Sequence, residues 1–295
     1  MLDQLKFLLE HLKPNPKQFD EIYAELHQGY HPRKDPWGLN LKKHRTCFEL
    51  IWPLYQYYFR VKFHHPEHIE NKPYLIIANH SGQIAIDALL VMAAFLFEKH
   101  PPRVVRAMID RFLPKLPFVG ELVSEIGSVL GERQNCLHLL DHKETVLVFP
   151  EGVTGIAKPS NKFYTLQKFT TGFFRMAAQK EVEVLPLAIV GAEEFYPHVA
   201  HFPKIAKALG LPAFPVTPTF PWLGPLGILP LPSPVDIYVG KPYAFPKTLK
   251  SDAPDKDIQK HVTKLKKQIQ KMIDEGLKQK RNYFGEVERV HRKRR

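Results

Sequence analysis

The chain carries a histidine and a carboxylate at a spacing that could remove a proton from a hydroxyl group. His80 follows an apolar run that begins at Tyr74, and Asp87 comes seven residues after the histidine. A neutral imidazole accepts a proton at physiological pH, and a carboxylate partner fixes its tautomer and stabilises the imidazolium. Gly82 allows the intervening loop to curl, so that Asp87 can point back at His80. Taken alone, the pair also fits a structural histidine that caps a strand.

A second segment with chemical potential begins at another apolar run, residues 146–149. It continues as Pro150-Glu151-Gly152-Val153-Thr154-Gly155, and Lys158 follows three residues later. Proline ends the strand, the two glycines leave backbone amides accessible, and Lys158 adds positive charge. A loop of this kind can bind phosphate or stabilise a developing oxyanion. The alternative is an ordinary glycine turn after a strand.

Both segments need a scaffold that brings the ends of separate strands together. Short β-rich runs alternate with helix-length stretches at 87–98 and 166–178. The runs are residues 74–78, 104–108, 145–149, 182–190 and 235–239. This alternation predicts an α/β fold with a mainly parallel central sheet flanked by helices. In such folds ligands gather at the carboxyl ends of the strands, which is where both segments fall.

Three regions are expected along the chain. Residues 1–60 read as an N-terminal helical region, with Asn15-Pro16 as the cap and first position of one helix. Its aromatic-rich part, residues 47–59, suits either core packing or contact with a membrane interface. Residues 61–250 form the α/β domain. Residues 251–295 form an amphipathic helix and a basic tail, which are either solvated or in contact with anionic lipid.

Residues 208–235 interrupt the α/β pattern. The stretch contains no charged residue, and eight prolines fall between Pro212 and Pro234. It is therefore neither a helix nor a central strand. We expect either a loop packed over the core or one wall of an acyl-chain groove that touches lipid.

Charge and composition limit the partners. The net charge of +12 suits an anionic surface or ligand, but no clustered basic and aromatic face indicates nucleic acid. No apolar segment reaches the about 20 residues that a membrane span requires, and the N-terminus does not read as a signal peptide. Cys47 and Cys136 indicate a reducing compartment. We expect a cytoplasmic protein, peripheral on an anionic membrane surface.

Together, the two segments resemble the glycerophospholipid acyltransferase superfamily, whose signatures are Asn-His with a following Asp and then Phe-Pro-Glu-Gly. The segments 127–133 and 184–188 are similar to two further blocks of that family, and all four occur in the family's order. Three features resemble the branch of monoacylglycerol and diacylglycerol acyltransferases. They are the motif Asn-His-Ser-Gly, the segment 190–194 and the run from Pro218.

The resemblance implies an O-acyltransferase acting on glycerol(phospho)lipids. It would move a fatty-acyl group from an acyl thioester, acyl-CoA or acyl-carrier protein, to a hydroxyl of a glycerolipid or lysophospholipid. His80 would be the general base and Asp87 its partner, with no metal and no cofactor beyond the thioester co-substrate. The implied substrate-binding residues are Arg133, Glu151, Gly152, Thr154 and Lys158. For Glu151 and Gly152 the resemblance implies either binding of the acceptor or shaping of the active-site loop.

Three departures from the family pattern leave the acceptor open. Six residues separate His80 from Asp87, where the family usually has four, and Thr154 stands where many members carry an arginine. Arg133 can also be out of register with the family's arginine. The acceptor is therefore lysophosphatidate, another lysophospholipid, monoacylglycerol or another alcohol. A lipid-binding protein of the same fold without turnover is the alternative function.

Overall fold

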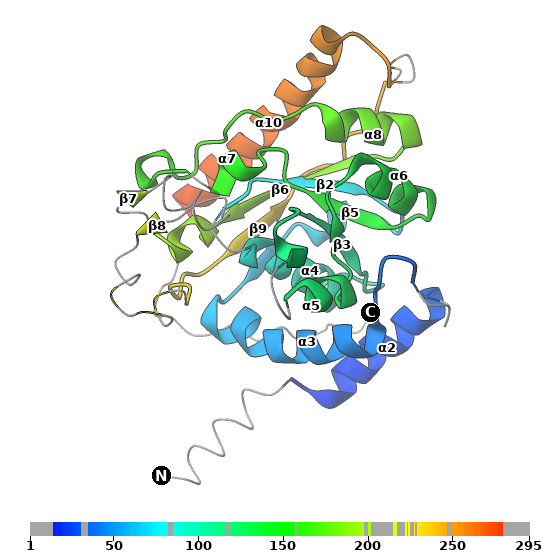
Figure 1. Ribbon diagram of the computed structural model, residues 1–295, viewed down its shortest axis with the longest axis vertical. Helices are drawn as coiled ribbons and strands as arrows, with labels where there is room; N and C mark the ends of the chain where they lie inside the picture. The colour runs from blue at the N-terminus through cyan, green and yellow to red at the C-terminus, as the bar shows by residue number, and fades with distance from the viewer. Residues whose placement is uncertain are drawn as a thin grey trace.

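The computed structural model describes residues 14–30, 35–81, 85–115, 119–156, 158–197, 229–246 and 251–279, with short pieces at 200–201, 215–216, 222, 224, 227 and 249. The first 13 residues of the predicted N-terminal helical region, the basic tail and most of the proline-rich run lie outside these residues. The described residues form one central sheet with helices on both faces, seen in Figure 1.

The sheet has the strand order β1-β9-β6-β2-β5-β3-β4. The five strands β6, β2, β5, β3 and β4 run parallel to one another, whereas β9 runs antiparallel to β6 and parallel to β1. The predicted mainly parallel sheet is thus confirmed. The strands are β1 (Lys62–His64), β2 (Leu75–Ala78), β3 (Val105–Ile109), β4 (Val129–Leu130), β5 (Thr145–Val148), β6 (Val184–Val190) and β9 (Asp236–Val239), with a separate pair β7 (Ala200–His201) and β8 (Pro215–Val216).

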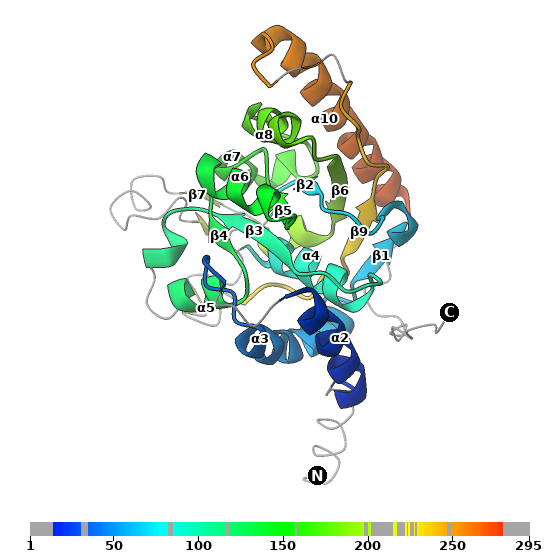
Figure 2. The ribbon, with the colours of Figure 1, turned by 90° about the vertical axis from the view of Figure 1, so that its right-hand side faces the viewer.

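Helices cover both faces of the sheet. On one face lies α4 (Ile86–Phe97), with α2 (Pro16–Gly29), α3 (Leu41–Pro53) and α5 (Val119–Glu125) on the same side in Figure 1. On the other face lie α6 (Arg133–Asp141), α8 (Gly172–Lys180) and α10 (Asp255–Lys278), and Figure 2 shows α10 running along the sheet. Neighbouring side chains of a strand point to opposite faces of the sheet. In β2, Ile76 packs in the apolar core on the α4 face, and Ile77 packs in the core on the α10 face.

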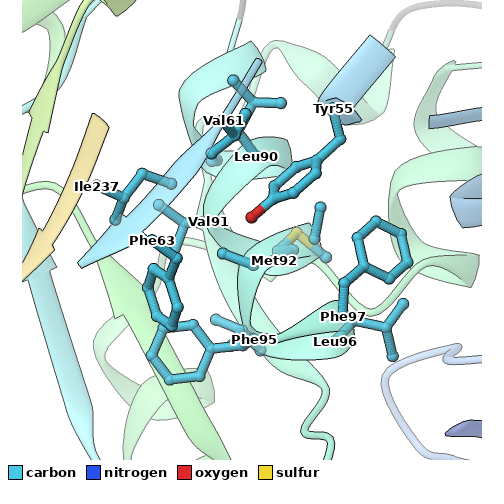
Figure 3. Close-up of a cluster of buried hydrophobic side chains, with 14 of the residues drawn as sticks. Tyr55, Val61, Phe63, Leu90, Val91, Met92, Phe95, Leu96, Phe97 and Ile237 are labelled. Carbon is cyan, nitrogen blue, oxygen red and sulfur yellow. The ribbon is translucent and has the colours of Figure 1, made fainter. Parts of the chain in front are cut away.

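Helix α4 carries apolar residues on all of its faces, and the surrounding protein encloses all of these faces. Ten of its residues are buried, and an all-round apolar helix is stable only inside a protein core or a membrane. Figure 3 shows its side chains packed between β-strand residues and the aromatic segment that follows α3. Phe63 and Ile237 contribute from β1 and β9, and Tyr55 from the short π-helix Leu54–Tyr58. This packing fixes the first turn of α4, which carries Asp87.

The N-terminal helices begin where their caps predict and join the same core. The Asn15 side chain accepts a hydrogen bond from Lys17 N at 3.0 Å, as expected for an N-cap before Pro16. Between α2 and α3, the Asp35 carboxylate pairs with both terminal nitrogens of fully buried Arg106 on β3, at 2.9 and 3.1 Å. This two-point ion pair attaches the N-terminal region to the sheet.

The aromatic-rich segment divides between core and surface. Phe48, Trp52 and Tyr55 are buried with α4, which confirms core packing for the aromatic side chains. Leu50 and Leu54, in contrast, are 70% and 41% exposed. The segment therefore presents these two leucines outward, buries four of its rings, those of Phe48, Trp52, Tyr55 and Phe59, and leaves Tyr57 and Tyr58 half-buried.

The helix expected at 166–178 begins six residues late, at Gly172. The backbone amides of Leu166 and Gln167 donate to the side chains of Gln270 and Glu151, and Thr170 N donates to Pro150 O. These amides are engaged outside any helix, so the segment stays irregular. Long-range hydrogen bonds have overridden the local helical pattern.

Glu98, which follows α4, makes a pH-dependent contribution to stability. Burial raises the pKa of its carboxyl group to about 7, while a hydrogen bond from Tyr55 Oη opposes that rise. A raised folded-state pKa stabilises the fold below the unfolded pKa, and this contribution is lost as the pH rises through 7. We expect Glu98→Gln, which keeps the acceptor for Tyr55, to match the wild type at pH 4.5. At pH 8 it should be more stable by about 3 kcal/mol. Urea unfolding at both values measures this, and parallel pH profiles would contradict it.

Candidate active site

The candidate site lies at the carboxyl edge of the sheet, where β2 and β5 end side by side. Asn79, directly after β2, donates from Nδ2 to Ile189 O at 2.9 Å and accepts at Oδ1 from Ile189 N at 2.7 Å. Its side chain thereby continues the pairing between β2 and β6 after the β2 backbone has left the ladder. Residue 80 is thus fixed in position relative to the strand end.

His80 and Asp87 are in direct contact, as the sequence predicted. The Nδ1 atom of His80 lies 2.7 Å from Asp87 Oδ2, which also accepts a hydrogen bond from Ser81 N at 2.8 Å. Asp87 is fully buried in the first turn of α4, where the helix dipole favours a negative charge. Because a carboxylate only accepts hydrogen bonds, Nδ1 carries the proton and Nε2 is left as the basic nitrogen.

The imidazole of His80 is held on a second side by Phe149. The two rings are stacked with centroids 4.1 Å apart and an interplanar angle of 15°. Phe149 directly precedes the Pro-Glu-Gly turn, so β2 and β5 each deliver one ring of this stack. From the sequence, Phe149 was recognised only as part of the Phe-Pro-Glu-Gly motif. Its contact with His80 could have been inferred from its position, because it is an aromatic residue at the end of a strand that neighbours β2.

His80 lines a cavity of about 340 Å³ between the strand ends and α6, α7 (Val153–Ile156) and α8; α7 marks this edge in Figure 1. Most of its lining is apolar. Asp110, Glu132 and Arg133 contribute the charged side chains. The apolar and sulfur-bearing side chains that line it are Met108, Ile109, Phe112, Cys136, Val148, Phe149, Ile156 and Met176.

Cys136 is the thiol in this cavity. Burial raises the pKa of its side chain to about 12, so it remains protonated at physiological pH. A protonated thiol is a weak nucleophile. Cys136 therefore contributes to the lining of the cavity and does not supply a reactive thiolate.

The five expected substrate-binding residues occupy three kinds of position. Arg133 and Gly152 line the cavity, and Arg133 also donates to Gln179 Oε1 at 2.9 Å. Glu151 and Lys158 are 3% exposed and lie outside the cavity lining. Thr154 is exposed, and its hydroxyl donates to Glu151 O at 2.6 Å.

Glu151 holds the backbone around His80. Its Oε1 accepts a hydrogen bond from His80 N at 3.1 Å, and its Oε2 accepts one from Gln167 N at 2.6 Å. The carboxylate therefore joins residues that are far apart in the sequence. This geometry fits shaping of the active-site loop, which is one of the two roles that the family resemblance implies for Glu151.

Gly155 allows α7 to approach His80 closely. A Cβ atom at this position would lie 3.0 Å from His80 Cβ and 2.9 Å from Glu151 Cβ. We expect Gly155→Ala to push the two residues apart, to reduce activity and to lower the free energy of unfolding by about 1–3 kcal/mol. Turnover and chemical denaturation measure the two effects. Gly29→Ala is the control, because no atom lies within 4 Å of the added methyl group; equal behaviour of the two variants would contradict the packing argument.

The three histidines of the His-His-Pro-Glu-His segment, residues 64–68, each pair with a carboxylate or a backbone carbonyl. His64 Nε2 lies 2.7 Å from Asp236 Oδ1, His65 pairs with Glu67, and His68 Nδ1 donates to Val239 O at 2.8 Å. In the part of the chain that the structure describes, no group of three or more His, Cys, Asp or Glu side chains is arranged to hold a metal ion. Nor does any helix of that part have the length and apolarity to cross a membrane.

The fold and the site together define an α/β protein in which the histidine of a histidine–carboxylate pair lines a largely apolar cavity. The chain belongs to the acyltransferase family: the family's sequence model, described as Acyltransferase, matches residues 60–190. In addition, the crystal structure of the 1-acyl-sn-glycerophosphate (LPA) acyltransferase PlsC from Thermotoga maritima is similar to 82% of this chain and 79% of its own, with a TM-score of 0.52. At 17% sequence identity this likeness shows a shared fold.

Two curated relatives extend the comparison. An uncharacterised protein of Mycobacterium tuberculosis is 32% identical over 243 residues, which are 80% of this chain and 68% of that protein. The chain spans about two thirds of the length of the mycobacterial relatives that it matches. The bovine protein named "DGAT1/2-independent enzyme synthesizing storage lipids" is 27% identical over 118 residues, 40% of this chain and 34% of that protein.

Proposed function

We propose that the protein is an O-acyltransferase that moves a fatty-acyl group from an acyl thioester to a hydroxyl of a glycerolipid or lysophospholipid. The observation that carries this proposal is the His80–Asp87 pair at the wall of a largely apolar cavity. Family membership and the PlsC-like fold support the reaction class. The printed names of PlsC and of the bovine relative support a glycerolipid acceptor.

In the proposed reaction, His80 acts as the general base. Its Nε2 takes the proton of the acceptor hydroxyl while the hydroxyl oxygen attacks the thioester carbonyl carbon. The new C–O bond forms a tetrahedral intermediate, the C–S bond then breaks, and the thiolate leaves with the proton returned by the imidazolium. Asp87 stabilises the imidazolium and keeps the proton on Nδ1.

Arg133 and Gly152 are the proposed substrate contacts, because both line the cavity beside His80. Arg133 can form charge-assisted hydrogen bonds to a phosphate of the acceptor or of acyl-CoA. Gly152 has a φ of +55°, a conformation in which glycine is favoured, and without a side chain it allows a substrate to approach the cavity wall closely. The apolar lining suits the hydrocarbon chain of either substrate.

A turnover assay tests the proposal. Purified protein is mixed with radiolabelled palmitoyl-CoA, or with palmitoyl-carrier protein, and with lysophosphatidate, lysophosphatidylcholine, monoacylglycerol, diacylglycerol or a long-chain alcohol. We expect thiol release that depends on one of these acceptors, together with the matching labelled product. A protein that binds the lipids but releases no thiol with any acceptor would instead be the lipid-binding alternative.

We also propose that the protein rests on an anionic membrane, because both substrates are amphiphiles. Leu50 and Leu54 are 70% and 41% exposed, and Leu229 is 60% exposed. Tyr58, in the turn that follows Leu54, donates from Oη to Pro230 O at 2.6 Å, which brings this turn beside the residue next to Leu229. Such a group of exposed apolar side chains is suited to insertion at a bilayer surface. The protein would thus work as a peripheral membrane protein on the cytoplasmic side.

Flotation with phosphatidylglycerol-containing liposomes tests this attachment. The double variant Leu50→Ser/Leu54→Ser should float several-fold less than the wild type, because it loses apolar area that would insert into the lipid. Leu277→Ser changes a leucine on α10 that is 39% exposed, close to the 41% of Leu54, and serves as the control. Equal flotation of the double variant and the control would place the contact elsewhere, and a wild type that stays unbound at low salt would reject membrane attachment.

A further inference from the structure

Three charged side chains are buried together behind the His80 loop. Lys158 Nζ lies 2.7 Å from Glu193 Oε1 and 3.6 Å from Glu151 Oε2. Each of the three residues is only 3% exposed. Burial raises the pKa of the Glu193 carboxyl group, and the neighbouring ammonium of Lys158 opposes that rise. We call Glu151, Lys158 and Glu193 the ion triad.

The ion triad spans the strands on both sides of β2. Glu151 comes three residues after the end of β5, and Glu193 comes three residues after the end of β6. In the sheet β2 lies between these two strands, and it ends two residues before His80. Lys158 therefore bridges two carboxylates across the strand end that carries the histidine.

Backbone N–H groups also donate hydrogen bonds to both carboxylates of the ion triad. Glu151 accepts hydrogen bonds from His80 N and Gln167 N, and Glu193 Oε2 accepts one from Tyr164 N. Each glutamate thus holds a loop as well as one side of the lysine. A shift of the Lys158 ammonium would reach the backbone of His80 through a single intervening side chain, that of Glu151.

Stability alone does not account for such a buried group. Replacing buried ion pairs by apolar side chains of similar volume is often neutral or stabilising, because three charges must be taken out of water. What the ion triad supplies is a fixed distance between the ends of β5 and β6. A misplacement of a reacting group by about 1 Å can reduce turnover by about 10²-fold.

We propose that Lys158 is a positioning residue that holds His80 in place through Glu151, with Glu193 as its anchor, and that it does not bind substrate phosphate. This inference rests on the proposed function of His80 as the base. It assigns a role to Glu193, and it replaces the substrate-binding role expected for Lys158. The contact with Glu193 and the burial of both side chains keep the ammonium directed into the protein.

Kinetics of four variants test the proposal: Lys158→Met, Glu193→Gln, the double variant, and Lys162→Met as the matched control on an exposed lysine of the same segment. We expect kcat to fall about 10–100-fold in each triad variant, with KM for thioester and acceptor changed less than 2-fold. The loss in the double variant should be close to that in a single variant, because the residues act as one unit. Lys162→Met should keep wild-type turnover.

Other patterns would overturn the inference. If Lys158 binds phosphate, Lys158→Met raises KM for phosphorylated substrates alone, and Glu193→Gln does not reproduce the effect. If the triad variants match Lys162→Met in kcat, or if the two single losses multiply in the double variant, no positioning unit exists. A wild-type protein without thioester turnover would instead reject the proposed function.

Hydrogen–deuterium exchange gives a readout that does not depend on turnover. We expect Lys158→Met to speed exchange of the His80 amide at least 10-fold, because its acceptor Glu151 is no longer held by the lysine. The same peptide should be unchanged in Lys162→Met. If Lys158→Met fails to fold, Glu193→Gln carries the test, since it keeps a side chain of the same shape and an oxygen acceptor; unchanged exchange in a folded triad variant would contradict the proposal.

Discussion

His80→Ala should lower the rate of acyl transfer by about 10²–10⁴-fold without unfolding the protein, which is the range that general-base assistance typically contributes. The imidazole is 8% exposed and lines the cavity, so its removal leaves the cavity without its basic nitrogen. KM for the thioester should change little, because the hydrocarbon contacts of the cavity remain. Initial rates at saturating thioester and acceptor measure the loss.

The matching control is His138→Ala, which removes an exposed imidazole from α6. Circular dichroism and thermal unfolding establish that both variants are folded. Wild-type turnover in a folded His80→Ala protein would remove the proposed base, whatever the behaviour of the control. Equal losses in both variants would indicate a general effect of preparation and not a role for residue 80.

Asp87→Asn should produce the second large loss, about 10³–10⁴-fold in kcat by analogy with other histidine–carboxylate pairs. The carboxylate accepts hydrogen bonds from Ser81 N and Ala88 N while it contacts His80 Nδ1. An asparagine amide must turn its NH₂ group toward one of these backbone amides, and it brings no negative charge to the imidazolium. A stability loss of about 1–3 kcal/mol should accompany the change.

Asp141→Asn provides the comparison for this substitution, because Asp141 is an exposed carboxylate paired with Lys180. Its turnover should equal that of the wild type. If a folded Asp87→Asn protein also keeps wild-type kcat, the carboxylate is structural and His80 needs no ionised partner. A rise in KM with an unchanged kcat would assign Asp87 to substrate binding.

The sequence predicted the central strands well because each is a short buried run with clear boundaries. Residues 75–78 and 145–148 lie in the middle of the sheet and are apolar apart from Thr145. The two-residue strand β4 and the short β1 carry no comparable pattern, and neither was predicted. The insertion of β9 between β1 and β6 depends on pairing partners far apart in the chain, which a local pattern does not encode.

For the site, the residue types and one contact were predictable, whereas the directions of the other side chains were not. The His80–Asp87 contact followed from chemistry and from a glycine in the loop, and the structure contains it. Whether Lys158 faces a ligand or two carboxylates depends on Glu193, which lies 35 residues away and carries no local signal of its position. Asn79 and Phe149 were visible as motif letters, but their contacts with Ile189 and His80 arise only in the folded sheet.

The position of β9 also determines which fragments of the chain are able to fold. The segment matched by the family, residues 60–190, contains β1 but lacks β9, and β9 is the strand that pairs with β1 and with the outer edge of β6. A chain that ended at residue 190 would leave β1 without its pairing partner and one edge of β6 unpaired. It would also expose the apolar face against which α10 packs. An exposed strand edge of this kind is prone to aggregate. Expression boundaries should therefore extend at least through α10.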